Sequence, residues 1–238
     1  MLITIPKSIT SLYFCGDLHG NLQYLKYHIK QYNITNSCII CAGDIGLGFC
    51  DNTQEINFLN KFCELRNVYL IFVRGNHDDP NIFMSHKYDK YCKTVADYDI
   101  INVCNLNILC IGGGISIDRE WRKTLSKCAY WEDEIIKYQP KVSEKINIIV
   151  SHSAPSFAYP VGIGKIVHDF AENDSTLITD VINERQTLDI IWSDYKSDIT
   201  HWYYGHYHST QYQVIDGVVF KLLDISEIVR HVTDNDLL

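Results

Sequence analysis

The sequence carries no excess of positive charge. Its 238 residues include 21 Lys and Arg against 29 Asp and Glu, which gives a formal net charge of −8 at pH 7 and a pI of about 5.6. Proteins that follow a nucleic-acid backbone do so with a broad cationic surface, so broad nucleic-acid binding is disfavoured. The acidic balance suits a chain with several divalent-metal ligands, but an acidic surface also serves solubility alone.

The sequence also lacks an apolar run near the ~20 residues that cross a bilayer. The segment from Met1 to Pro6, followed by Lys7, has no long apolar stretch with a small-residue cleavage site, so no signal peptide is predicted. We therefore expect a cytoplasmic protein with no membrane partner.

No cysteine pattern indicates a disulfide framework or a zinc ribbon. Most of the nine cysteines lie inside apolar runs. Cys38 and Cys41 have the two-residue gap of a redox or zinc pair, but Ile39 and Ile40 lie between them and no second pair follows. We predict that both are buried strand residues.

No internal repeat, low-complexity tract or linker divides the chain, so a single domain over residues 1–238 is expected. Short apolar or β-branched runs that end in Gly, Asp, Asn or His predict strands. These runs are residues 11–15, 37–42, 68–73, 108–111, 146–150 and 218–223. Helical periodicity over 22–32 and 53–63 gives the order of a partly parallel α/β sheet with crossovers. Residues 156–199 are expected to form a helical insert over one end, before a strand near His201.

Five polar segments lie at or beside the ends of predicted strands, and four of them contain glycine. They are Gly16-Asp17-Leu18-His19-Gly20, Gly43-Asp44, Gly75-Asn76-His77-Asp78, Ser151-His152-Ser153 and Gly205-His206-Tyr207-His208. Open α/β sheets place their sites in loops beyond the carboxyl ends of strands. We therefore expect these side chains to meet at one edge.

The segments supply oxygen and nitrogen ligands in numbers that suit two metal ions. The seven candidates are Asp17, His19, Asp44, Asn76, His152, His206 and His208. On extended backbone Asp17 and His19 point to the same side and can bind one ion, and the same geometry applies to the two histidines of the last segment. Seven ligands are more than one tetrahedral ion can bind, but they suit two ions that share a carboxylate. Asp44 is the candidate for the shared carboxylate.

The ordered set D-x-H, GD, GNH, H and GHxH resembles the calcineurin-like metallophosphoesterase superfamily, over residues 16–208. The resemblance implies a fold of two mixed β-sheets packed face to face and flanked by helices, an α-β-β-α sandwich. It implies one metal held by Asp17, His19, Asp44 and His208, and a second held by Asp44, Asn76, His152 and His206. These ligands suit Mn²⁺, Fe, Zn²⁺, Co²⁺ or Ni²⁺, so we expect two divalent metal ions of unassigned identity.

The same resemblance implies that His77 is the catalytic histidine, which protonates or stabilises the leaving oxygen. A hydrogen-bonding turn histidine is the alternative. Where the protein-phosphatase branch carries GDxVDRG, this chain has Leu47 and Gly48 in place of the second Asp and the Arg. The carboxylate that orients the histidine is thus missing from that loop, and Asp78 is the candidate to replace it. A serine/threonine protein phosphatase is not indicated.

A glycine-rich segment, Gly112 to Arg119, precedes Arg122 and the stretch Tyr130-Trp131-Glu132-Asp133-Glu134 and resembles a segment of bacterial and phage-type members. Two interpretations of Arg119 and Arg122 stay open. One of them replaces the missing arginine as a bidentate phosphate-binding group, or both pair with nearby Asp118 or Glu120 on a solvated face.

These features predict a dinuclear-metal phosphoesterase that hydrolyses a phosphate ester with a metal-activated hydroxide. A phosphomonoesterase is favoured, since the helical insert suits a small substrate. A phosphodiesterase or nuclease, and a non-catalytic scaffold of the same fold, are the alternatives. The expected partner is a phosphorylated small molecule, a nucleotide or a phosphoprotein, and the oligomeric state is not indicated.

Overall fold

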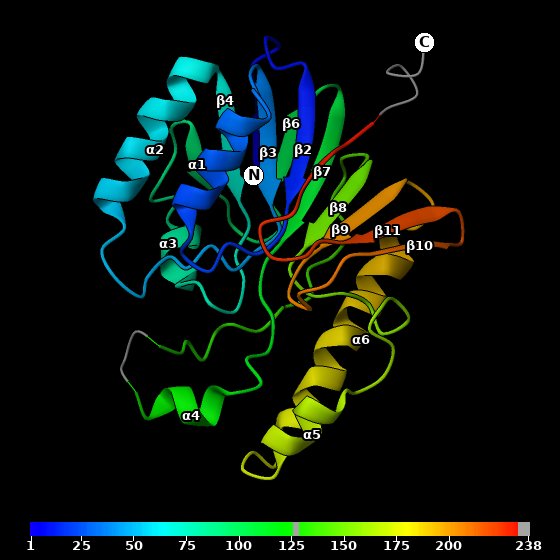
Figure 1. The fold of residues 1–238 in the computed structure, drawn as a ribbon. Helices are drawn as coiled ribbons and strands as arrows, with labels where there is room; N and C mark the ends of the chain where they lie inside the picture. Colours follow the sequence, from blue (N-terminus) through cyan, green and yellow to red (C-terminus); the bar gives the residue numbers. More distant parts are fainter. Residues whose placement is uncertain (126–128, 233–238) are drawn as a thin grey trace.

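The computed structural model describes residues 1–125 and 129–232, and within them two mixed β-sheets pack face to face between helices (Figure 1). The seven-stranded sheet has the order β1 (Leu2–Thr4), β6 (Ile100–Val103), β7 (Leu106–Ile111), β8 (Ile148–Ser151), β9 (His201–Tyr204), β11 (Val218–Leu222), β10 (Gln211–Ile215). The five-stranded sheet has the order β12 (Ile228–Arg230), β2 (Ser11–Cys15), β3 (Ser37–Cys41), β4 (Val68–Phe72), β5 (Cys92–Thr94). The predicted fold class, an α-β-β-α sandwich, is confirmed.

The central strands are buried on both faces because their side chains alternate between two cores. In β3, Cys38 and Ile40 lie in the core between the sheets, whereas Ile39 and Cys41 lie in the core under the helices. Cys38 and Cys41 are fully buried on opposite faces of one sheet. The prediction of buried strand cysteines is confirmed, and a redox or zinc pair is excluded.

The helices α1 (Leu22–Gln31) and α2 (Thr53–Arg66) cover the outer face of the five-stranded sheet (Figure 1). The side chain of Asn21 caps α1 by accepting the N–H of Tyr24, at 3.1 Å. Asn67 ends α2 in the left-handed conformation, with φ 52°. Short helices α3 (Pro80–Met84) and α4 (Arg119–Lys123) follow loops of the candidate site.

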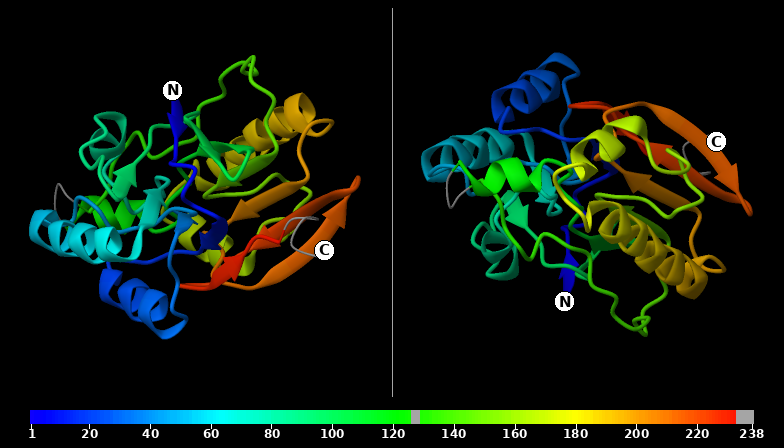
Figure 2. Two further views of the ribbon diagram at one scale, coloured as in Figure 1. Left: turned by 90° about the horizontal axis from the view of Figure 1, so that it is seen from above. Right: turned by 90° about the horizontal axis from the view of Figure 1, so that it is seen from below.

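The region predicted as a helical insert contains α5 (Lys165–Ala171) and α6 (Leu177–Tyr195). Its long helix α6 is the outer layer over the seven-stranded sheet, where Leu188, Ile191 and Trp192 share a core with Trp202 and Phe220. The short helix α5 lies beside the amino-terminal half of α6, at the end of the molecule below the sheets (Figures 1 and 2). The region 156–199 therefore provides the outer helical layer over the seven-stranded sheet, and it also covers one end of the molecule.

The six predicted strands and two predicted helices are present, with ends that differ by a few residues. The strands that sequence patterns missed are β1, β5, β6, β10 and β12. Four of these five are the edges of the two sheets. Edge strands are short and pair on one side only, so they lack the continuous apolar run that marks a central strand. No helix of the described residues is both long and apolar enough to span a bilayer.

Candidate metal centre

The five polar segments all follow the carboxyl ends of inner strands, and they come from both sheets. Three segments follow β2, β3 and β4 of the five-stranded sheet, and two follow β8 and β9 of the seven-stranded sheet. Each of these two sets of strands is parallel and in register, so its loops emerge at one edge. The sandwich brings the two edges together, and the expected convergence of the segments is present.

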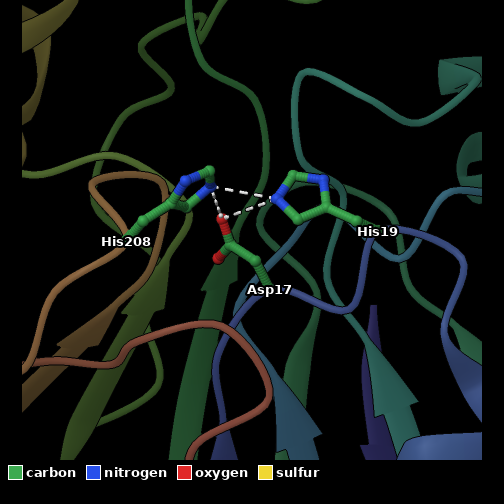
Figure 3. Close-up of side chains that lie close together, drawn as sticks. All are labelled: Asp17, His19 and His208. Atoms are coloured by element: carbon green, nitrogen blue, oxygen red, sulfur yellow. Dashed lines mark hydrogen bonds and ion pairs between the residues drawn. The ribbon is translucent and has the colours of Figure 1, made fainter.

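A first group of candidate ligands consists of Asp17, His19 and His208, whose ligand atoms all lie within 4.8 Å of one another (Figure 3). The two Nε2 atoms of the histidines are 2.9 Å apart. Oδ2 of Asp17 lies 3.2 Å from Nε2 of His208 and 3.8 Å from Nε2 of His19. Three electron-rich atoms from two distant loops thus point at one location.

A second group is formed by Asp44, Asn76 and His152 in a buried position. Nε2 of His152 lies 2.9 Å from Oδ1 of Asn76 and 3.2 Å from Oδ1 of Asp44. The other ring nitrogen, Nδ1, lies 2.8 Å from the carbonyl of Ala42. A hydrogen bond from Nδ1 to that carbonyl leaves the lone pair of Nε2 directed at the centre, as in histidines that bind metal.

Asp44 lies between the two groups. Its Oδ2 is 3.9 Å from Nδ1 of His19, while its Oδ1 faces His152. A carboxylate with one oxygen toward each group has the placement that a shared ligand needs.

The spacing argument for the paired histidines was wrong in its geometry. His206 and His208 do not approach one point: His208 faces Asp17 and His19, whereas the ring of His206 packs on His152 with centroids 4.9 Å apart. The segment is not extended, because both residues have left-handed backbone, with φ 68° and 45°. This turn therefore places His208 in the first group of candidate ligands and His206 beside the second group.

Left-handed backbone recurs among the candidate ligands. His19 and Asp44 also have positive φ, at 46° and 49°. Non-glycine residues rarely adopt this conformation, and such strain concentrates at functional sites. Four of the seven candidates are therefore held in a costly conformation that the surrounding structure imposes.

Two glycines allow the loops to approach the carboxylates closely. A Cβ on Gly75 would lie 2.0 Å from Oδ1 of Asp44, and one on Gly205 would lie 2.1 Å from Oδ1 of Asp17. No side chain fits at either position. The backbone N–H of His206, next to Gly205, donates to both oxygens of Asp17 at 3.1 and 3.2 Å.

The electrostatics of the buried group favour a cation. Burial raises the pKa of Asp44, but the facing His152 and His77 hold that pKa well below its usual range. Burial lowers the pKa of His152, but Asp44 and Asp17 beside it raise the pKa to about 10. The position between these groups therefore attracts positive charge. A proton on His152 balances part of the carboxylate charge, and a divalent ion balances more of it.

The donor set fits two divalent ions. Carboxylate, imidazole and amide oxygen donors of the types preferred by first-row transition metals face two adjacent locations, and Asp44 borders both. The structure would place Asp17, His19 and His208 on one ion and Asn76, His152 and His206 on the other.

His77 lies at the edge of the centre. Its Nδ1 is 3.7 Å from Oδ2 of Asp44, and its backbone N–H donates to Oδ1 of Asp44 at 2.8 Å. With His19 and Asp44 it also forms a group whose ligand atoms lie within 4.8 Å of one another. Burial and the positive charge of Arg122 lower the pKa of His77, against the opposing effect of Asp44. A neutral imidazole at this position can exchange a proton near neutral pH.

The expectation that Asp78 orients His77 is corrected. The carboxylate of Asp78 is buried and accepts four backbone N–H groups, from Ile45, Gly46, Leu47 and Gly75, at 2.8–3.0 Å. No hydrogen bond joins Asp78 to His77 within the described residues. Asp78 instead fixes the Asp44 loop to the Asn76 loop, because the turn at Gly46 and Gly48 leaves N–H groups that need an acceptor.

The phosphate-binding role of Arg119 is also corrected. Its guanidinium donates to Asp174 at 2.5 and 3.1 Å, to Thr176 at 2.8 Å and to Asp180 at 2.6 Å. Arg119 therefore neither faces the pocket nor pairs with Asp118 or Glu120; it fastens α4 to the segment between α5 and α6.

Arg122 remains a candidate for binding the phosphate group. Its Nε donates to Asp118 at 2.6 Å, and both residues line a pocket that also contains His77. The pocket has a volume of about 460 Å³. It is lined by Asp44, Asn76, His77, Ile115, Ile117, Asp118, Arg122, Ile166, Val167, Phe170, Val181, Glu184, His206, Tyr207 and His208. Residues from three of the polar segments thus border a space of ordinary small-molecule size.

Sequence patterns missed two buried groups that support Asn76. Nδ2 of Asn76 donates to Oγ of Ser116 at 3.0 Å, and that hydroxyl donates to Glu134 at 2.6 Å. Burial raises the pKa of Glu134 to about 8, although the hydroxyl and N–H of Ser116 lower it. Glu134 closes the stretch after Tyr130 that the resemblance singled out, but nothing in the sequence indicated its partner.

The chain matches the family model described as calcineurin-like phosphoesterase over residues 10–210. It is similar to the solved structure of TT1561 of Thermus thermophilus, at 10% identity over 91% of this chain and 90% of that one, with a TM-score of 0.52. It also matches phosphopantetheinyl hydrolase of Mycobacterium tuberculosis, at 14% identity over 92% and 91% of the two chains, with a TM-score of 0.41. A novel archaeal phosphodiesterase matches at 14% identity over 94% of this chain and 100% of that one, with a TM-score of 0.40. No curated protein matches the chain.

Proposed function

We propose that this chain, which belongs to the calcineurin-like phosphoesterase family, is a phosphomonoesterase with two divalent metal ions and a small phosphorylated substrate. Its family makes it a hydrolase of phosphate esters. The observation that carries the finer proposal is the convergence of seven donor side chains from five loops beside one bounded pocket. All candidate ligands and His77 are present, which argues against a non-catalytic scaffold.

The pocket favours a monoester. Arg122 places a positive charge beside His77, where it complements the second negative charge of a phosphate monoester. Residues of α5 and α6 line the pocket as well, and their side chains limit the size of the leaving group.

The proposed chemistry divides among the residues as follows. When bound, the two ions polarise the phosphoryl oxygens and make water a stronger nucleophile. Asp44 stays a carboxylate because the histidines beside it hold its pKa low. His77 takes up a proton from solvent and passes it to the departing oxygen, and Arg122 orients the phosphoryl group.

A paired assay tests the proposal. The protein, reconstituted in turn with Mn²⁺, Fe²⁺, Zn²⁺, Co²⁺ and Ni²⁺, is given p-nitrophenyl phosphate and bis-p-nitrophenyl phosphate. We expect a higher kcat/KM for the monoester. A preference for the diester would assign a phosphodiesterase instead, and no turnover of either ester would favour a binding scaffold.

A further inference from the structure

The pocket has an apolar side that the metal centre does not explain. Helix α5 buries none of its seven residues. Its Ile166 and Phe170 are 59% and 36% exposed, and both line the pocket together with Val167 and Val181. Partly exposed apolar side chains around a pocket are the usual wall of a small-molecule site.

One charged residue, Glu184, interrupts this apolar wall. It lies seven residues after Leu177 and four before Leu188, on the face of α6 that points inward, and it is only 6% exposed. Its Oε2 is buried and has no hydrogen-bond partner within the described residues. A buried acceptor without a partner is costly, so its presence calls for an explanation.

The neighbouring arginine does not satisfy Glu184. The guanidinium of Arg185 donates to the carbonyls of Ala154, Pro155, Ala158 and Pro160. Burial raises the pKa of Glu184 to about 7, although the hydroxyl of Ser153 and the charge of His152 lower it. Glu184 thus has acceptor capacity beside the apolar side of a pocket whose opposite side carries the polar residues of the candidate centre.

We propose that this side of the pocket is the leaving-group subsite, in which Glu184 selects phosphate monoesters whose alcohol combines an apolar body with an N–H or O–H donor. The inference rests on the proposed function for the position of the phosphate. With the phosphoryl group at the metal centre, the alcohol extends toward α5 and α6. The apolar body covers Ile166 and Phe170, and the donor binds the carboxylate of Glu184, which lines the pocket beside them.

Matched esters test the subsite. The esters are 4-(hydroxymethyl)benzyl phosphate, which has a donor, and 4-(methoxymethyl)benzyl phosphate and 4-methylbenzyl phosphate, which have none. Their leaving alcohols are similar in size and reactivity. We expect the wild-type protein to favour the hydroxymethyl ester by ~10–100-fold in kcat/KM, the usual value of a hydrogen bond to a charged group.

Two substitutions at Glu184 separate the hydrogen bond from the fold. Glu184→Met keeps the length of the side chain without an acceptor, and it should reduce the preference to near unity. Glu184→Gln retains one acceptor oxygen and should keep part of the preference. Phe170→Ala, as a matched control in the apolar wall, should weaken all three esters alike and leave the ratio unchanged.

Calorimetry with the non-hydrolysable phosphonate analogues, with and without added Mn²⁺, provides a readout independent of turnover. If the phosphonates bind with the expected preference but no ester is hydrolysed, the proposed function fails and the subsite stands. If the wild-type protein binds the three analogues equally, or if Glu184→Met keeps the preference, the subsite proposal is overturned whatever the activity.

Discussion

At the scale of single residues, the candidate centre shows that the same residue type has different tasks in adjacent positions. Asp44 and Asp78 are both buried, in loops that follow strands of the five-stranded sheet. Asp44 faces imidazoles, which keep it ionised, whereas Asp78 faces backbone N–H groups. The partner of each carboxylate, and not its residue type, decides whether it can bind a metal or fasten a loop.

His77 is predicted to act on the leaving group and not to hold metal. The variant His77→Gln should retain both metal ions, measured by elemental analysis, and lose ~100-fold or more in kcat on esters with poor leaving groups. Esters with good leaving groups, such as p-nitrophenyl phosphate, should lose less, because they need little protonation. Loss of metal from the variant would instead show that His77 is a metal ligand. Its ring nitrogens lie close enough to the ligand atoms of His19 and Asp44 for that role.

Glu184 should make stability depend on pH. Burial raises its pKa from 4.5 to about 7, so the folded chain binds a proton that the unfolded chain releases between these values. Stability from this group is therefore full below pH 4.5 and falls as pH rises from there through 7, by roughly 3 kcal/mol in all.

The variant Glu184→Gln imitates the protonated form. In the presence of chelator, it should melt above the wild-type protein at pH 8 and close to it at pH 5, as followed by circular dichroism. Equal melting temperatures at pH 8 would contradict the assigned environment of Glu184.

At the scale of elements, the site depends on how α4, α5 and α6 are fastened to one another. Arg119 of α4 binds Asp174 and Asp180, which flank the start of α6. Asp118 and Arg122, at either end of the same short helix, line the pocket. The ion pairs of Arg119 therefore hold the pocket wall of α4 against that of α5 and α6.

Removal of this connection should destabilise the chain and loosen the pocket. Arg119→Met leaves Asp174 buried without its cation and should cost roughly 3–5 kcal/mol in urea unfolding. Lys123→Ala on the same helix breaks an exposed pair with Glu120 and should cost about 1 kcal/mol or less. Equal effects of the two substitutions would show that Arg119 is not a structural connection.

At the scale of the whole molecule, the two sheets are joined at the candidate centre as well as through their apolar core. Asp17, Asp44 and Asn76 come from the five-stranded sheet, and His152 and His208 come from the seven-stranded sheet. Ions at this position would bind both halves of the sandwich, so metal binding and folding are expected to be coupled.

Removal of metal with a chelator should accordingly lower the melting temperature. Ions present at about 100 times their dissociation constant contribute about 2.7 kcal/mol each, or roughly 5–10 °C for a chain of this size. Asp44→Asn, which alters the carboxylate between both groups, should abolish this response to metal together with activity. Asp169→Asn, on an exposed face of α5, should leave the response intact. A chelator response that persists in Asp44→Asn would remove Asp44 from the centre.

The sequence by itself determined the central architecture and the identity of the candidate centre. Central strands can be recognised because strands buried on both faces are mostly apolar, as in residues 38–41. The polar segments can be recognised because ligand-type residues, next to glycine in four of the five segments, lie at or beside the ends of predicted strands. Both signals are local, so the resemblance they carry could be found without coordinates.

Only the tertiary structure decided the partners of the charged residues. The sequence presents Asp78 as a candidate to orient His77 and Arg119 as a candidate to bind phosphate, and it does not single out Glu184. Their roles depend on atoms 31 to 61 residues away, such as the N–H of Leu47 for Asp78 and the carboxylate of Asp180 for Arg119. Hydrogen bonds and burial are properties of positions in space, and the order of residues along the chain specifies those positions only through the complete fold.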